Sequence, residues 1–553
     1  MKSSKKQYIN MPYAVKNPRT GKIVCTLHAK DDAGNTVSVS VVRGEDSKSV
    51  SNKLLASGAD LPLAERDIWL AQIQGLTDLK PDKMFEEGRH GWNGLSSTNN
   101  LTYLSTRYRY GTGNFRLSDE LRENLRLKHY QKGTLEGATE LAGFALKSDA
   151  ATAALCAGYA AMILRFLGLK PFAIYFHGPS KIGKSTLQLL AASISGMNDD
   201  DQMFKLLDSV AGLMENAALF SGRVFPIDEV KGKSTHPRQI FDAISQIVMT
   251  IASGTTKVTH SSFNNGRSGE ALDTIVVMSG RKSLSEYAVE CGMNLDDGEA
   301  ARVVQIRALR SLRKRTLVDH PEPRPLKEQE ELAQNYPVLL RERIAQNHGK
   351  TLGIFIKYIL DDHEEKVARL RRYSNDFLQH KNTSRGDEAF NHGVKSFASL
   401  YAAGCMAIDA DLIPTSHKRL LSSLQECVDR MENPVEIAEE QRQQVLRTLR
   451  EALRDAPHAD DVRSPAADDN PIYFRKDGSV VCHKVSLCQL LGGDHAGDLL
   501  ADYLSDTGLV VSRRNSGKSA LLRMTNSERW PLGGKAQAVV FKDPWPEDRK
   551  RRK

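Results

Sequence analysis

A phosphate-binding loop, flanked by a strand-like run and a helix-like run, lies in the middle of this 553-residue chain. Residues 172–177 form a short apolar run typical of a buried strand, and residues 186–195 have the pattern of a helix. The sequence between them contains Gly-Pro-Ser-Lys-Ile-Gly-Lys-Ser, a complete G-x-x-x-x-G-K-S motif. Backbone N–H groups and a helix N-terminus can surround phosphates in that setting. The context favours a P-loop nucleotide fold over a glycine-rich turn without a ligand.

The loop residues have distinct expected tasks. Lys184 is expected to reach the β- and γ-phosphates, and the Ser185 hydroxyl is expected to bind Mg²⁺. ATP and Mg²⁺ are therefore the predicted cofactors. The predicted nucleotide-binding residues are Gly178, Pro179, Ser180, Lys181, Ile182, Gly183, Lys184, Ser185 and Thr186.

Two carboxylates follow a second apolar run, at residues 224–227. Asp228 is predicted to hold Mg²⁺, directly or through water, and Glu229 to orient or deprotonate the attacking water. A strand that ends in a solvated acidic turn would give the same pattern. The position of this run downstream of the P-loop favours the catalytic interpretation.

Two more residues complete the predicted catalytic set of Lys184, Glu229, Ser279 and Arg302. Ser279 follows the strand-like run 274–278, where a polar side chain can contact the γ-phosphate or the water. Arg302 precedes another strand-like run, 303–306. In ring-forming ATPases such an arginine stabilises charge on the neighbouring subunit's γ-phosphate. A surface arginine beside a strand remains the alternative.

A basic hairpin is predicted between the acidic strand and the Ser279 strand. Asn265-Gly266 between β-compatible runs is a strong hairpin signal. Lys257, His260 and Arg267 would give this hairpin positive charge for DNA phosphates, as in the pore of a ring translocase. An ordinary surface hairpin is the alternative.

A second basic turn lies near the C-terminus. Arg513, Arg514 and Lys518 lie between short strand-like runs, which suggests the wing of a winged helix contacting DNA phosphates. The triplet Gly517-Lys518-Ser519 is no second P-loop, because Ser512 stands where the first glycine should be.

Composition limits the class of protein and its surroundings. The net charge of +9 and the pI of about 9.0 are compatible with nucleic-acid binding without proving it. Seven cysteines without a C-x-x-C pair fit a reducing cytosol, so zinc at Cys482, His483 and Cys488 is disfavoured. No signal peptide opens the sequence, and the apolar segment 150–169 carries Arg165, as a buried helix can. We expect a cytoplasmic protein with no membrane segment.

The expected fold class is α/β, with a P-loop ATPase core of the AAA type between other modules. An N-terminal α+β module is predicted over 1–130, including a hairpin of residues 22–28 and 36–42 and two helices in 47–75. The core is expected at 131–320. A helical lid at 321–455 has predicted helices 326–347, 353–372, 388–407 and 435–454, with Arg385 and Lys395 as candidate nucleotide contacts. A linker at 456–471, a winged-helix-like domain at 472–545 and a basic tail at 546–553 complete the chain.

With these residues placed, the chain resembles the bacterial domain-of-unknown-function 927 family from about residue 54 to about residue 408. The resemblance rests on Gly91-Trp92, the helix 150–169, the P-loop, Asp228-Glu229, Ser279-Gly280, Gly298 with Arg302, and the Ala-rich run 397–404. Arg281 departs from it, because family members usually carry an acidic residue there, and residues 254–259 lack the usual arginine before the hairpin.

The family looks like helicase-type ATPases carried by phages, plasmids and other mobile elements. The resemblance implies an ATP-driven ring, a hexamer, acting on DNA. Our expectation is therefore a ring-forming helicase or translocase for replication of a mobile element, with single-stranded DNA, further copies of itself and a primase or other replication proteins as partners. The alternative is an ATPase switch or remodeller in a phage-defence or regulatory complex, without processive unwinding.

Overall fold

The computed structural model describes most of the chain up to Arg454 and short stretches beyond it. The described residues are 9–18, 20–75, 84–94, 100–123, 129–206, 208–228, 237–254, 272–291, 302–310, 316–321, 325–380, 388–431, 434–454, 456, 472–474, 478–483, 487, 490–491, 500, 503–504, 507, 509 and 538–547. By contact the chain divides into two compact units, and the first holds residues 1–232, 243–281 and 301–431.

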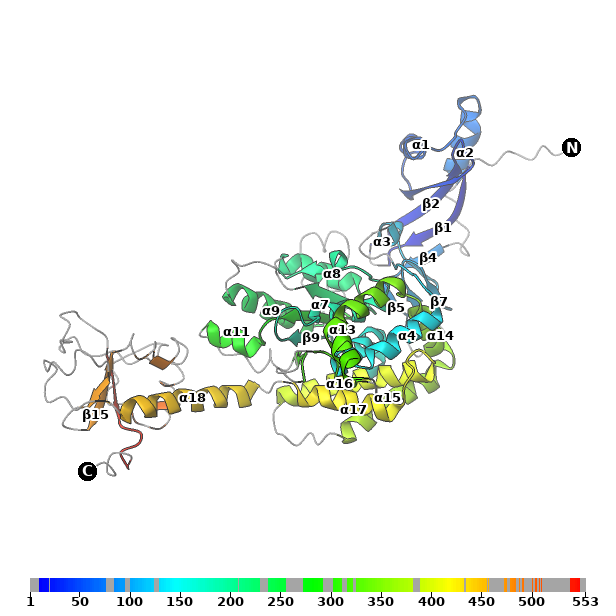
Figure 1. Ribbon diagram of the computed structural model, residues 1–553. Helices are drawn as coiled ribbons and strands as arrows, with labels where there is room; N and C mark the ends of the chain where they lie inside the picture. Colours follow the sequence, from blue (N-terminus) through cyan, green and yellow to red (C-terminus); the bar gives the residue numbers. More distant parts are fainter. Residues whose placement is uncertain are drawn as a thin grey trace. The chain divides into compact units, whose positions relative to one another are not determined.

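A five-stranded parallel sheet forms the centre of the first unit (Figure 1). Its order is β10-β11-β12-β9-β13, with bounds Phe204–Lys205, Val224–Asp228, Ile275–Gly280, Phe172–His177 and Val303–Arg307. The residues of β9, β11 and β12 are all buried, as the continuous apolar runs predict for strands of a parallel sheet. The strands expected at 172–177, 224–228, 274–278 and 303–306 are confirmed.

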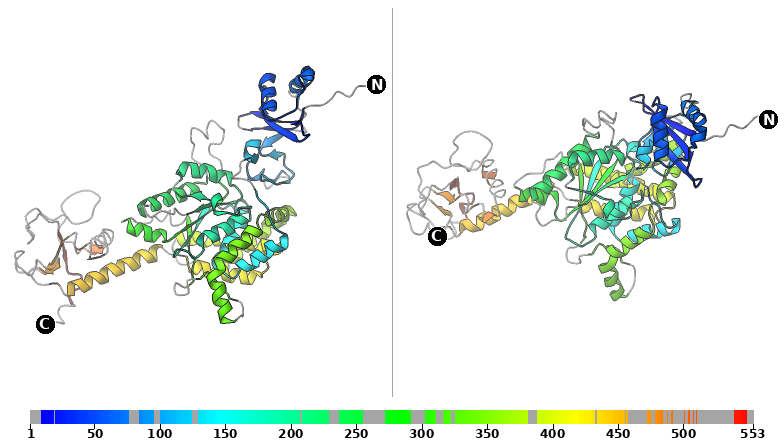
Figure 2. Two further views of the ribbon diagram at one scale, coloured as in Figure 1. Left: turned by 45° about the horizontal axis from the view of Figure 1, so that its top comes forward. Right: turned by 90° about the horizontal axis from the view of Figure 1, so that it is seen from above.

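Helices surround this sheet in the views of Figures 1 and 2. Helix α7 packs on β11 and β12, and α5 and α13 pack on α7. The helices of the core and the helical layer are α4 Leu135–Ala145, α5 Asp149–Ala160, α6 Leu164–Leu167, α7 Lys184–Ser193, α8 Val210–Leu219, α9 Pro237–Ala252, α13 Leu326–Gln346, α14 Thr351–Leu360, α15 His363–His380, α16 Glu388–Asp409 and α17 His417–Asp429.

Two of the predicted helices are broken in the structure. The segment 150–169 contains α5 and the separate short helix α6, and the segment 353–372 contains α14 and the start of α15. Asp361 is the C-cap of α14, and Asp362 has a left-handed backbone with φ of 53°. A single residue in that conformation ends one helix and lets the next begin at a new angle. Aspartate tolerates it better than most residues, but neither glycine nor proline marks the break.

The N-terminal sheet has the order β3-β2-β1-β4-β8, with bounds Thr36–Val42, Ile23–Lys30, Asn10–Lys16, Met84–Glu87 and Phe115–Arg116. The predicted hairpin is confirmed as the antiparallel pair β2–β3. The two helices predicted in 47–75 are α1 Ser47–Ala56 and α2 Arg66–Gly75, and α3 spans Asp119–Glu123. Trp69, Leu54 and Leu27 belong to one small core beneath this sheet.

A small antiparallel sheet, β5 Gly91–Asn93, β6 Thr102–Leu104 and β7 Arg109–Gly111, is attached to the core by polar contacts. The Trp92 indole N–H donates to the Met162 carbonyl at 2.7 Å, and the Tyr103 hydroxyl donates to the Gly222 carbonyl at 3.1 Å. Arg89 forms an ion pair of 2.5 Å with Asp273. Gly222 and Asp273 lie two residues before the starts of β11 and β12, so this small sheet is fixed to the amino ends of two central strands.

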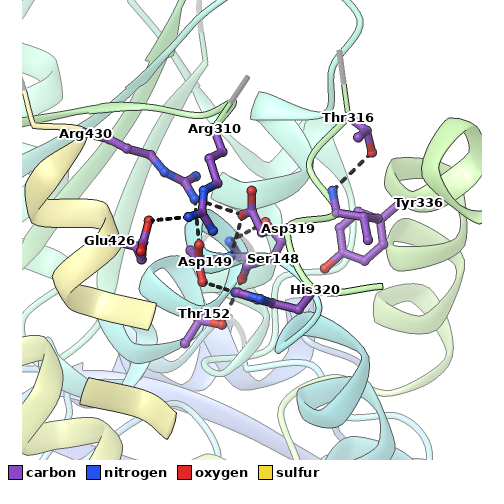
Figure 3. A network of polar contacts seen from close by, with 12 residues as sticks. Ser148, Asp149, Thr152, Arg310, Thr316, Asp319, His320, Tyr336, Glu426 and Arg430 are labelled. Atoms are coloured by element: carbon purple, nitrogen blue, oxygen red, sulfur yellow. Dashed lines mark hydrogen bonds and ion pairs between the residues drawn. The ribbon is translucent and has the colours of Figure 1, made fainter. Parts of the chain in front are cut away.

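A buried charge network joins α5, the segment after β13 and the end of α17 (Figure 3). Asp149 accepts from His320 and from Arg430, both at 2.6 Å, and Arg430 lies 3.2 Å from Asp319. Asp149, Asp319 and Arg430 are at most 8% exposed. Although burial opposes it, the bond from His320 and the charge of Arg430 hold the pKa of Asp149 below its ordinary value. Burial raises the pKa of Asp319.

The second unit holds residues 233–242, 282–300 and 432–553. It includes α11 Leu284–Glu290, α18 Pro434–Arg454 and an antiparallel sheet of β14 Ile472–Phe474, β15 Ser479–His483 and β16 Ala538–Lys542. Leu449 and Leu453 of α18 share a core with Phe474, Val480 and Phe541, so this helix packs with the C-terminal strands. The basic turn of the predicted winged helix, 513–518, lies outside the described residues. Among the described helices, none combines the length and the apolar character that crossing a membrane requires.

Candidate nucleotide-binding site

The P-loop connects the carboxyl end of β9 to the first residue of α7. Gly178, Lys181 and Gly183 have positive φ values of 144°, 66° and 100°. Glycine adopts such values without a steric cost, which explains the glycines at 178 and 183. Gly183 is the N-cap of α7 and carries no side chain that could occupy the first-turn N–H groups. These N–H groups and the positive end of α7 form a site suited to an anion.

Lys184 lies within this loop with only 7% of its surface exposed. Its ammonium donates to the carbonyls of Gly178 and Pro179, both at 2.8 Å. These bonds hold the positive charge against the loop, next to the helix N-terminus. A phosphate bound there would meet a charge that is already partly desolvated and oriented.

Ser185 and Asp228 meet at the same edge of the sheet. The Ser185 hydroxyl donates to Asp228 at 3.2 Å, and the Asp228 side chain is only 2% exposed. Gln188, one turn further along α7, donates to the carbonyls of Ile227 at 2.6 Å and Val277 at 2.9 Å. Gln188 thereby fixes α7 on β11 and β12. A hydroxyl and a carboxylate oxygen this close are a fitting pair of protein ligands for Mg²⁺, which usually keeps several waters.

Lys205, the last residue of β10, was not predicted from the sequence as part of this site. Its ammonium lies 3.9 Å from Asp228, but half of its side chain is exposed. A pair this exposed and this long contributes little binding energy.

Ser279 lies between the P-loop strand and the acidic strand. It is 5% exposed and is aligned with Phe176 of β9, while Gly280 is aligned with His177. The carboxyl ends of parallel strands lie at one edge of a sheet, so Ser279 and Asp228 share the edge from which the P-loop rises. Arg307 also reaches this edge, beside His177. Burial, with the nearby charges of Arg307 and Lys184, lowers the pKa of His177 to about 3.

Arg302 lies at the opposite edge. It precedes β13, and its carbonyl accepts from Ala173 near the start of β9 at 3.1 Å. Its guanidinium lies 2.8 Å from the sulfur of Met249. The five residues of β13 separate it from the P-loop edge by roughly 16 Å, at 3.2–3.4 Å per residue. Arg302 therefore cannot serve the P-loop of its own subunit.

Helix α13 contacts the P-loop directly, which sequence reasoning missed. A methyl group added at Gly183 would come within 2.7 Å of Pro337. One turn further along α13, Arg341 forms an ion pair of 2.6 Å with Asp200 and approaches the Thr186 hydroxyl at 3.4 Å. Of the expected lid contacts, Lys395 is exposed on α16 and Arg385 lies outside the described residues. The only sequence signal was the proline within a helical pattern, four residues before Arg341.

Several predicted residues cannot be placed. Glu229 and the two basic turns lie outside the described residues: Lys257, His260, Arg267, Arg513, Arg514 and Lys518. Cys482 is buried in β15, whereas Cys488 lies outside the described part of the chain. Within the described residues there is no group of three or more His, Cys, Asp or Glu side chains that could hold a metal ion.

Comparison with known proteins gives one family and one fold. Residues 9–270 match the model of the family described as "Domain of unknown function (DUF927)". A solved structure described as "SCCmec type IV Cch - active helicase" superposes with a TM-score of 0.59 at 13% sequence identity. The similarity covers 97% of this chain and 93% of that one, so it extends over nearly the whole fold. No curated protein matches the sequence.

Proposed function

We propose, from the premise that this chain belongs to the DUF927 family through residues 9–270, that it is an ATP-hydrolysing motor of the helicase or translocase class acting on DNA. The observation that carries the proposal is the meeting of Ser185 and Asp228 at 3.2 Å, at the N-terminus of a helix that follows a complete P-loop. N–H groups suited to phosphate, a buried lysine and two oxygens suited to Mg²⁺ converge there.

The strand order supports an ATPase core of the AAA type. Strand β12 lies between the P-loop strand β9 and the acidic strand β11, and it ends in a polar residue. This position supports a role for the Ser279 hydroxyl at the γ-phosphate or the attacking water. The fold similarity to a structure described as an active helicase fits the same class.

Each residue of the proposed site has a defined task. Bound Mg²⁺ would neutralise phosphate charge, with Ser185 and Asp228 as its protein ligands. Lys184 binds the β- and γ-phosphates, and the loop N–H groups bind the inner phosphates. Glu229 takes a proton from the attacking water, and Ser279 orients that water.

The position of Arg302 supports assembly of the motor into a ring. If it contacts a nucleotide, an arginine about 16 Å from its own P-loop edge contacts that of another subunit. We propose that copies of the chain pack so that Arg302 faces a neighbour's P-loop. Lys257, His260 and Arg267 are the proposed pore contacts to DNA, and Arg513, Arg514 and Lys518 the proposed peripheral ones. Replication of a mobile element is the proposed setting.

The test is ATP turnover with and without single-stranded DNA at two salt concentrations. A DNA motor should hydrolyse ATP faster with DNA, and this stimulation should weaken as salt rises, because phosphate contacts release counterions. Strand displacement measured beside it separates unwinding from translocation. A rate of ATP turnover that does not change when DNA is added, at either salt concentration, would favour an ATPase switch that acts on protein partners.

A further inference from the structure

We infer that Arg341 is a nucleotide-binding residue that contacts the inner, α-phosphate end of the bound nucleotide, and that Asp200 competes for the same guanidinium. The inference rests on the proposed function, because it assumes that the P-loop binds ATP. The inference adds to the site a residue of α13 that belongs to no sequence motif, and it specifies which phosphate this residue contacts.

The first step of the argument is the place of the guanidinium. Arg341 lies 3.4 Å from the hydroxyl of Thr186, the third residue of α7. The first three N–H groups of a helix have no partner within it and face a bound anion. Arg341 therefore lies at the border of the phosphate site, and 41% of its side chain is exposed to solvent.

The second step assigns the phosphate. Ser185 faces the sheet through Asp228, and Lys184 points back along the loop to the carbonyls of Gly178 and Pro179. The P-loop lysine reaches the β- and γ-phosphates, while the loop N–H groups cradle the α- and β-phosphates. Thr186 is the next residue along the helix, and its hydroxyl faces Arg341 of α13. Arg341 is thus next to the inner end of the triphosphate, which ATP and ADP share.

The third step is that α13 holds this position rigidly. Pro337 has no N–H group, so the carbonyl of Ala333 lacks its usual helix partner. The Thr316 hydroxyl donates to that carbonyl at 3.0 Å instead. The Tyr336 hydroxyl also donates to the carbonyls of Phe144 and Ala145, at 3.3 and 3.2 Å. Thr316 and Tyr336 are visible in Figure 3. The turn before Arg341 is therefore fixed on both sides.

The fourth step concerns Asp200. Its carboxylate holds one nitrogen of Arg341 at 2.6 Å, while the other terminal nitrogen approaches Thr186. A phosphate on the α7 N-terminus offers the guanidinium a second anionic partner with tetrahedral oxygens. Because one guanidinium serves both anions, removing the Asp200 charge strengthens nucleotide binding, whereas removing Arg341 weakens it.

The experiment is a titration of the full-length protein with ATP and with ADP, each with Mg²⁺. Arg341→Ala should raise the Kd for both nucleotides by the same factor, about tenfold for a lost charge-assisted contact. Arg341→Lys should recover part of the affinity. Asp200→Asn should bind both nucleotides at least as tightly as the wild type. Arg343→Ala is the matched control: its guanidinium lies over the ring of Phe144, 4.5 Å from the centroid, and nucleotide affinity should not change.

The outcomes separate the two proposals. If the wild type binds neither ATP nor ADP, the proposed function fails and the inference fails with it. If the wild type binds both and Arg341→Ala leaves both Kd values unchanged, or weakens ATP alone, the inference is wrong while the ATPase proposal stands. Equal weakening by Arg341→Ala and Asp200→Asn would assign the pair a purely structural role. Thermal unfolding without nucleotide identifies a variant that fails to fold. If Arg341→Ala fails to fold, the Kd values of Arg341→Lys for ATP and ADP test the inference in its place.

Discussion

Lys184 shows how a single residue combines burial and charge. A lysine with only 7% of its surface exposed is costly unless the donors of its ammonium are used, and two loop carbonyls accept from it. Polar contacts therefore hold the ammonium at the loop. This arrangement separates its contribution to nucleotide chemistry from its contribution to folding.

We expect Lys184→Ala to lower ATP turnover by at least about a hundredfold, because the charge that faces the β- and γ-phosphates is lost. Turnover at saturating ATP and thermal unfolding are the two measurements. Exposed Lys170→Ala, just before β9, is the control and should keep full activity. Substantial turnover by a folded Lys184→Ala protein would show that the assigned active site is wrong.

Buried histidines set a pH dependence of stability. Burial lowers the pKa of His129 to about 4, from 6.5 for an ordinary histidine, although its contact with the Gly349 carbonyl opposes the shift. Below pH 6.5 His129 becomes protonated in the unfolded chain, whereas in the folded protein it stays neutral until the pH approaches 4. The free energy of unfolding therefore falls as the pH falls through this window, by up to about 1.4 kcal/mol per pH unit for each such histidine.

The check is urea unfolding between pH 6.5 and 4.5. His129→Gln should flatten the loss of stability in that range, even if it is less stable at pH 7. His380→Gln changes an exposed histidine at the end of α15 and should leave the slope as it is. An unaltered slope in His129→Gln would mean that His129 is protonated in the folded protein.

At the scale of elements, the network around Arg430 fixes the junction between the sheet and the helical layer. Arg430 caps α17 and pairs with one carboxylate on α5 and one in the segment after β13. Met431 also pairs with Ile306 of β13. Three elements distant in sequence therefore depend on one buried cation.

Arg430→Met should destabilise the protein by about 3–5 kcal/mol, because it leaves two buried carboxylates without their cation. Arg369→Met is the matched control, since Arg369 also pairs with two carboxylates, Glu365 and Asp409, but at the surface. It should cost a small fraction of that loss. Chemical denaturation measures the free energy of unfolding of both variants. Equal losses of stability would contradict the conclusion that burial makes the Arg430 ion pairs the more important ones.

Local patterns predicted the central strands and the P-loop, because buried parallel strands and a glycine-rich loop each leave a continuous signal in sequence. Contacts between distant elements leave no such signal. Arg341 stands in an ordinary charged stretch, Arg-Glu-Arg, and its position beside Thr186 depends on how α13 packs against α7. The break at Asp361 and Asp362 was missed for a related reason, since a left-handed aspartate looks like any other in a helical pattern.

At the scale of the whole molecule, the two edges of the central sheet carry different parts of the proposed site. Asp228 and Ser279 lie at the P-loop edge, and Arg302 lies at the other. A site that needs both can be complete only when one subunit presents its P-loop edge to the Arg302 edge of another. Under the proposed function, assembly is then a condition of catalysis.

Arg302→Ala should bind ATP and hydrolyse it poorly. Mixed with Lys184→Ala, which is also inactive, it should regain activity, because some interfaces then pair an intact P-loop with an intact arginine. Turnover across a series of mixing ratios measures this. Arg307→Ala, at the P-loop edge of its own subunit, is the comparison. Failure to regain activity in assemblies shown to be mixed would argue against a shared site.

The attachment of the β5-β6-β7 sheet to the core determines where the chain can be truncated to give a folded fragment. Sequence patterns suggest a boundary near residue 130, but Trp92, Tyr103 and Arg89 make polar contacts to Met162, Gly222 and Asp273 across it. A fragment that began at residue 131 would lose all three contacts and would expose Phe166, whose ring packs against Trp92. Exposing this apolar surface to water would destabilise the fragment. The smallest stable fragment that contains the P-loop is therefore expected to begin before Arg89, so a core transplanted without the strands that precede it would lack part of its own support.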